Sequence, residues 1–159
     1  RPLVSQMTTH NALCFDRERH RAYYADTRTR IIWRQGLDPA TGWPSGDPVV
    51  FVDLRAHANH PEYKPDGATI DSKGGLWNAQ WGAARVARYA PDGQCTDVFS
   101  LPTGHSSCPA FGGADLTTLY VTTARQKLPK DVPGWQPTAG QTFALQTSFQ
   151  GVPEPQVIV

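Results

Sequence analysis

The stretch Lys64–Ala79, KPDGATIDSKGGLWNA, contains two turn signals, Asp66-Gly67 and Gly74-Gly75, on either side of a short alternation of apolar residues. Aspartate and glycine favour tight turns, and an apolar alternation between two turns is typical of a β-strand. The sequence therefore predicts a turn at Asp66, a strand immediately after it and a hairpin at Gly74-Gly75. A carboxylate in the first turn either stabilises that turn or points at a ligand.

The same pattern occurs upstream, in the segment NALCFDRERHRAYYADTRTRIIWR, which starts at Asn11. An offset of 55 residues places Asn11 on Asp66. One deleted residue in the turn then aligns Tyr23 with Trp77. A degenerate third copy, PAFGGADLTTLYVTTAR, starts at Pro109. Repeats of about 40 to 55 residues, each a set of antiparallel strands, are typical of a β-propeller.

Composition agrees with an all-β chain. The 159 residues include 14 Gly, 14 Pro and five Trp, and no segment shows a helical apolar repeat, so we expect very little helix. At the observed period the chain supplies about three blades, whereas propellers have about four to eight. We therefore expect either part of a larger ring or two chains that complete one another. The first alternative is favoured because the chain starts at Arg1 and runs straight into a strand-like unit.

Charge and cysteine content exclude several classes of partner. The net charge is +1 with no basic block, so we expect no nucleic-acid partner, and the apolar runs are too short to cross a membrane. The three cysteines, Cys14, Cys95 and Cys108, form no CxxC motif. This pattern predicts reduced thiols in a cytoplasmic protein, with Cys14 and Cys108 as buried core residues.

Asn11 and Asp66 open successive repeats, so in a propeller both would converge on the central axis. Amide and carboxylate oxygens suit a hard divalent cation such as Ca²⁺, Mg²⁺ or Mn²⁺, and Zn²⁺ is also possible. Two ligands are too few, so other blades or water would supply the rest. The alternative is that both side chains only stabilise turns.

The chain resembles the C-terminal half of the senescence marker protein / gluconolactonase / luciferin-regenerating enzyme family, the regucalcin-like six-bladed propellers. The resemblance covers nearly the whole chain. It rests on PDGATID, from Pro65, with GLWNA after it, and on FGGADLTTLYVTTAR, from Phe111. It implies that residues 1–159 are the C-terminal portion of one propeller domain whose N-terminal blades are absent.

The resemblance also implies a function. One divalent metal ion would be held by Asn11, Asp66 and a Glu from the missing half, with Asp66 as the general base that hydrolyses a sugar lactone to the sugar acid. The family's substrate-holding Arg and Asn lie in the missing half, so we expect this chain alone to be inactive. His10, next to Asn11, and His60, on the loop before Asp66, are candidates for substrate contacts. The alternative is edge packing for His10 and an exposed imidazole on a mobile loop for His60.

Two other functions stay open from the sequence. One is a non-catalytic calcium-binding propeller of the regucalcin type. The other is a Ca²⁺-dependent hydrolase similar to the phosphotriesterase propellers. The sequence specifies neither the lactone, nor the metal, nor the oligomeric state.

Overall fold

A computed structural model describes residues 2–57, 59–127 and 137–154, and it contains three antiparallel sheets. The first sheet has the order β1 (His10–Asp16), β2 (Arg21–Asp26), β3 (Ile31–Gly36) and β4 (Val49–Asp53). The second has the order β5 (Lys64–Ile70), β6 (Leu76–Trp81), β7 (Arg85–Tyr89) and β8 (Cys95–Ser100). The third contains β9 (Ser106–Gly112), β10 (Thr118–Thr123) and β11 (Thr142–Gln146), with β10 in the centre.

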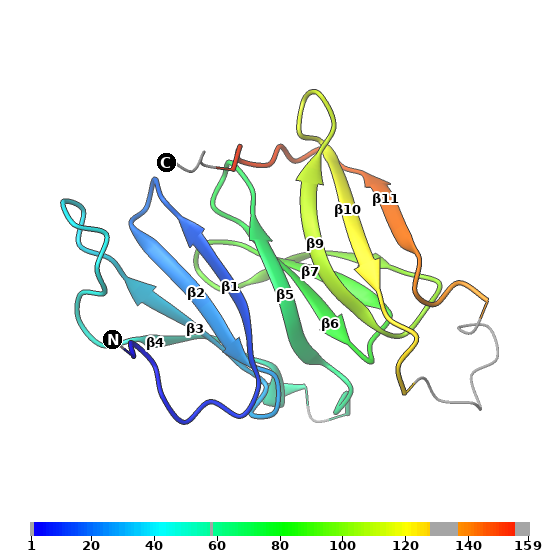
Figure 1. Ribbon diagram of the computed structural model, residues 1–159, viewed down its shortest axis with the longest axis horizontal. Coiled ribbons are helices and arrows are strands. Elements are labelled where there is room, and N and C mark those ends of the chain that lie inside the picture. Colours follow the sequence, from blue (N-terminus) through cyan, green and yellow to red (C-terminus); the bar gives the residue numbers. More distant parts are fainter. Residues whose placement is uncertain (1, 58, 128–136, 155–159) are drawn as a thin grey trace.

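The first strands of the three sheets lie next to one another, with β1 packed against β5 and β5 against β9 (Figure 1). This is the arrangement of three consecutive propeller blades with β1, β5 and β9 as the innermost strands. Among the described residues the only helical segment is the short 3₁₀ helix η1 (Leu54–Ala56). No helix there is long and apolar enough to cross a lipid bilayer. The prediction of an all-β propeller with very little helix is confirmed.

Strand register confirms the internal repeat. Ala25 pairs with Ile32 across β2 and β3, and Ala79 pairs with Val86 across β6 and β7, so both partners shift by the same 54 residues. The hairpin predicted at Gly74-Gly75 joins β5 to β6, and Gly74 has the positive φ of 77° that a tight turn requires.

The segment Pro65–Gly67 is not the tight turn that the sequence predicted. It lies inside β5, where the pairing with β6 is irregular between Pro65 and Ala68, as in a β-bulge. Strand β1 has the same irregularity between Asn11 and Cys14. These residues form a bulge and not a turn, because β6 continues alongside them and pairs with β5 both before and after them. Bulges redirect side chains and are common beside active sites.

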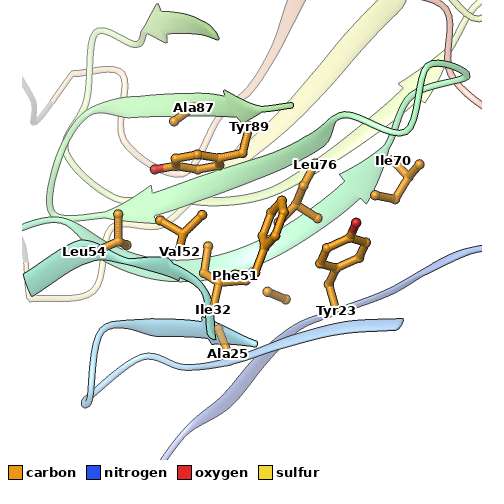
Figure 2. Packing of buried hydrophobic residues seen from close by; sticks show 11 residues of the cluster. Tyr23, Ala25, Ile32, Phe51, Val52, Leu54, Ile70, Leu76, Ala87 and Tyr89 are labelled. Carbon is orange, nitrogen blue, oxygen red and sulfur yellow. The ribbon is translucent and has the colours of Figure 1, made fainter. Parts of the chain in front are cut away.

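Two buried clusters hold the sheets together. The first lies between the first and second sheets, as Figure 2 shows, and includes Tyr23, Ile32, Phe51, Leu76 and Tyr89. The second lies between the second and third sheets and includes Trp77, Val86, Leu119 and Val121. A large apolar side chain contributes about 1.5–3 kcal/mol when it is fully buried. The sheets are therefore held to one another mainly by these clusters.

Asp71 anchors the inner hairpin of the second sheet from within. Its Oδ2 atom accepts hydrogen bonds from Arg88 Nε, at 2.7 Å, and from Trp77 Nε1, at 2.8 Å. Its Oδ1 atom accepts from the backbone N–H of Gly75, at 2.9 Å. Only 1% of Asp71 is exposed. The role of this carboxylate is therefore structural, since these partners lie on β6, on β7 and in the hairpin between β5 and β6.

Candidate functional site

Asn11 and Asp66 lie on adjacent inner strands, and one side chain connects them. Asn11 Nδ2 donates a hydrogen bond of 2.7 Å to Thr27 Oγ1, and Thr27 Oγ1 donates one of 2.7 Å to the carbonyl oxygen of Pro65. The amide of Asn11 is therefore two hydrogen bonds away from the peptide unit that leads into Asp66. The predicted convergence of the two repeat positions on neighbouring strands is consistent with this connection.

The Asp66 carboxylate is half-buried, and burial raises its pKa to about 6, against the opposing effect of a hydrogen bond from the Gly67 N–H. In the described part of the chain no basic side chain forms an ion pair with it. A carboxylate withdrawn from water without a positive partner is unfavourable in its charged form. A bound cation would remove that penalty.

The third inner strand borders Asp66 from the other side. Strand β9 carries its own irregularity between Ser106 and Cys108, and Cys108 lies against Gly67, the residue after Asp66. Burial is the main cause of the raised pKa of Cys108, and the Asp66 carboxylate adds to it. Cys108 as a whole residue is exposed, so the prediction of a buried core thiol was wrong for it. The cause is the bulge, which directs this residue out of the core.

Gly67 allows β5 to approach β9. A Cβ atom at this position would lie 2.7 Å from the backbone oxygen of Ser107 and 2.9 Å from the Cα atom of Cys108. Both distances are shorter than real Cβ contacts, and the atoms met are backbone atoms that cannot rotate away. The close packing of the two inner strands therefore requires glycine here.

We expect Gly67→Ala to destabilise the protein by about 1–3 kcal/mol, because the new methyl group must push two inner strands apart. Urea denaturation of the complete protein measures this change. Gly42→Ala is the control, since a Cβ atom there meets nothing within 4 Å and only the backbone φ of 71° is unfavourable. Equal losses in the two variants would contradict the steric argument.

The two histidines predicted as substrate contacts both stack on tyrosines. The His10 ring lies 5.7 Å from the Tyr24 ring, and the His60 ring lies 4.5 Å from the Tyr63 ring. His60 Nδ1 is also 2.9 Å from a carboxylate oxygen of Glu62. Both histidines are exposed. These contacts leave a role in substrate binding as a prediction.

An arginine that sequence reasoning missed fixes the connection between η1 and β5. The guanidinium of Arg30 donates hydrogen bonds to the carbonyl oxygens of Leu54, at 2.7 Å, His60, at 2.9 Å, and Tyr63, at 3.2 Å. The guanidinium carbon of Arg85 lies 3.5 Å from the centre of the Tyr63 ring. The chain that enters β5 just before Asp66 is therefore held by two arginines from neighbouring sheets.

The sequence profile described as the SMP-30/Gluconolactonase/LRE-like region matches residues 1–125. The chain belongs to the SMP-30/gluconolactonase/LRE-like family. The match spans more than half of the chain and includes both Asn11 and Asp66. It confirms the family that the repeated motifs resemble.

Relatives of this member of the SMP-30/gluconolactonase/LRE-like family include named lactonases. The 6-deoxy-6-sulfogluconolactonase of Pseudomonas putida is 36% identical over 154 residues, which cover 96% of this chain and 51% of the relative. The L-arabinolactonase of Azospirillum brasilense is 39% identical over 142 residues, which cover 89% of this chain and 45% of the relative. The chain spans about half the length of the curated relatives it matches.

A solved structure described as a calcium-binding protein, regucalcin, from Agrobacterium tumefaciens is also similar. It superposes with a TM-score of 0.85 at 34% identity, over 96% of this chain and 50% of that one. The similarity extends over all three sheets, since nearly the whole chain takes part in the superposition. The comparison therefore supports the arrangement of the three sheets.

The donor set of this family member fits a divalent cation but is incomplete. Asn11 and Asp66 offer oxygen atoms of the kind that Ca²⁺, Mg²⁺ and Mn²⁺ prefer. Within residues 2–57, 59–127 and 137–154 there is no group of three or more His, Cys, Asp or Glu side chains that could hold a metal ion. The predicted pair can therefore be only part of a complete ligand set.

A cavity of about 190 Å³ lies elsewhere, at the opposite ends of β1 and β5. Its lining includes Phe15, Arg17 and Asp71, and neither Asn11 nor Asp66 contributes to it. The candidate site in this family member is therefore the pair of bulges near the beginnings of the inner strands.

Proposed function

We propose that this chain forms three blades of a six-bladed, metal-dependent sugar lactonase, as the C-terminal portion of its propeller domain. The observation that carries the proposal is the Asp66 carboxylate, which is half-buried, lacks a cationic partner in the described residues, and follows the peptide bonded to Thr27. Two relatives named as lactonases, each more than a third identical, support a sugar lactone as the substrate. The complete protein would convert that lactone to the sugar acid.

Asn11 and Asp66 would hold one divalent cation, either Ca²⁺, Zn²⁺, Mn²⁺ or Mg²⁺. The calcium-binding description of the similar regucalcin structure supports a divalent ion in general. When bound, such an ion supplies a Lewis acid that polarises the lactone carbonyl and lowers the pKa of water. Asn11 would contribute a neutral amide oxygen, which adds no negative charge to the ion.

The chain's own residues would move the proton. A carboxylate oxygen of Asp66 accepts a proton from the attacking water as the water oxygen bonds to the carbonyl carbon. The same oxygen returns that proton to the ring oxygen when the carbon–oxygen bond of the lactone breaks. Water is added across one bond and Asp66 ends in its starting form. His10 and His60 remain candidates for contacts to the sugar hydroxyls.

A second candidate is a calcium-binding propeller without turnover, favoured by the superposition on regucalcin at a TM-score of 0.85. Both candidates use the same two oxygen donors and differ only in whether a lactone is hydrolysed. We expect the 159-residue chain by itself to show no turnover under either candidate, since two donors bind a metal weakly.

Hydrolysis assays with and without a chelator separate the candidates. The complete protein is incubated with gluconolactone or arabinolactone, and acid release is followed with a pH indicator against the uncatalysed rate. We expect treatment with EDTA to lower turnover by at least about a hundredfold, because the Lewis acid is lost, and one of the four cations to restore it. Full turnover after chelation would contradict metal dependence. Tight Ca²⁺ binding with no hydrolysis would instead establish the second candidate.

A further inference from the structure

The hydroxyl group of Thr27 lies between two sheets and makes one hydrogen bond to each. It follows β2 in the turn of the first sheet, accepts from Asn11 Nδ2 on β1 and donates to the Pro65 carbonyl on β5. Both distances are 2.7 Å, and the residue is half-buried. Thr27 is therefore the one described side chain that is bonded both to a candidate ligand and to the peptide preceding the other.

The direction of these two bonds follows from hydrogen-bond chemistry. A carbonyl oxygen can only accept, so the single proton of the Thr27 hydroxyl must be donated to Pro65. The hydroxyl oxygen is then left only as an acceptor, and its partner on Asn11 must be the amide nitrogen. The Asn11 side chain is thereby oriented with Nδ2 toward Thr27 and Oδ1 on the other branch of the amide.

Asn11 Oδ1 has no hydrogen bond from any described residue, while Nδ2 is occupied. An amide binds a metal cation through its oxygen and not through its nitrogen. This orientation therefore leaves the metal-binding atom of Asn11 available. The Pro65 carbonyl and the Asp66 N–H belong to one planar peptide unit. A bond to that carbonyl therefore also restrains the backbone from which the Asp66 side chain projects.

We propose that Thr27 is a positioning residue of the candidate metal site, with a hydroxyl that orients the Asn11 amide and restrains the Pro65-Asp66 peptide together. This inference rests on the proposed function, because it assigns Thr27 to the same cation site. Residues that orient metal ligands typically change metal affinity by about 10–100-fold when they are removed. A purely structural threonine would affect folding stability and leave metal affinity unchanged.

The test uses two matched pairs of side chains that differ by the hydroxyl. Native threonine is compared with Thr27→Val, and Thr27→Ser with Thr27→Ala, all in the complete protein. Dissociation constants for Ca²⁺ and Mn²⁺ are measured by titration calorimetry, and urea denaturation of the metal-free proteins is run in parallel. We expect Thr27→Val and Thr27→Ala to bind metal about 10–100-fold more weakly than their hydroxyl-bearing partners. Thr27→Ser should bind within about threefold of native, because it retains both hydrogen bonds.

The two pairs keep the proposal falsifiable if the valine variant fails to fold, because the serine and alanine variants still differ only in the hydroxyl. Native affinity in Thr27→Val or Thr27→Ala would overturn the inference, as would equal weakening in Thr27→Ser and Thr27→Ala. Asn11→Ala separates this result from a failure of the proposed function. If Asn11→Ala weakens metal binding and the hydroxyl deletions do not, only the role of Thr27 is wrong. If Asn11→Ala has no effect, the metal site itself is wrong.

Discussion

Asp66→Asn will lower lactone turnover in the complete protein by about a thousandfold or more. The substitution keeps the shape of the side chain but removes its negative charge and its ability to accept a proton. General-base catalysis alone contributes about 10²–10⁴-fold, and loss of a charged metal ligand adds to that. The measurement is the rate of acid release from the lactone at saturating metal, combined with the metal dissociation constant.

The same substitution should stabilise the metal-free protein at neutral pH. Burial raises the pKa of Asp66 to about 6 from an ordinary value of 3.8, so the folded state holds this proton more tightly than the unfolded state. Stability of the metal-free protein therefore falls as the pH rises from about 4 to 6, and the loss persists above that range. Asp66→Asn removes this loss, so its advantage should be largest above pH 6 and vanish near pH 4.

Asp92→Asn is the matched control for both measurements. Asp92 lies in the exposed turn between β7 and β8, where its carboxylate accepts a hydrogen bond from the backbone N–H of Gln94 at 3.0 Å. It should change neither turnover nor metal affinity. The assignment of Asp66 fails if Asp66→Asn retains native turnover, or if it binds metal as tightly as the control.

Asp71→Ala will destabilise the protein by about 3–5 kcal/mol, because the buried guanidinium of Arg88 then keeps, among the described residues, only the more distant Asp97 carboxylate as an ion-pair partner, 3.9 Å away. The side chain of Arg88 is 7% exposed and lies 2.7 Å from the Asp71 carboxylate. The indole N–H of Trp77 loses its acceptor at the same time. A loss of this size is a large fraction of the total stability of a typical domain. Urea denaturation of the complete protein measures it.

The internal repeat supplies a control for this prediction. Asp16 occupies the place of Asp71 in the first sheet, but its partner Arg19 is 32% exposed and the ion pair is 3.4 Å long. Water can solvate that arginine once the carboxylate is gone, so Asp16→Ala should cost only about 1 kcal/mol. Similar losses at the two positions would show that burial of the arginine is not what makes Asp71 important.

Much of the fold could be predicted from the sequence because the same pattern of strand and turn residues occurs in successive repeats. Asn11 and Asp66 are 55 residues apart and Tyr23 and Trp77 are 54 apart, and the strand register follows these two offsets. The bulge at Asp66 could not be predicted in the same way. Proline, aspartate and glycine have the same local preferences in a tight turn and in a bulge, and only the continuing partner strand distinguishes the two.

The surroundings of the candidate site were less predictable because they are not repeated. Thr27 has Trp81 at its place in the next repeat, so comparing the repeats conceals its role. The contact between Cys108 and the neighbourhood of Asp66 is between blades and depends on a third strand. The burial of residues at equivalent positions also depends on which sheet packs against them. Trp77 is fully buried, whereas Tyr120, which corresponds to it in the third sheet, is 42% exposed.

The glycine at position 67 sets a limit on how this scaffold can diversify. Its missing side chain lets two main chains come into contact, so backbone atoms determine the spacing between these inner strands at this point. A descendant that evolved to bind a larger ligand near these strands would have to enlarge the site at other positions. Sequence differences among such descendants should therefore be concentrated away from the contact between β5 and β9 at Gly67.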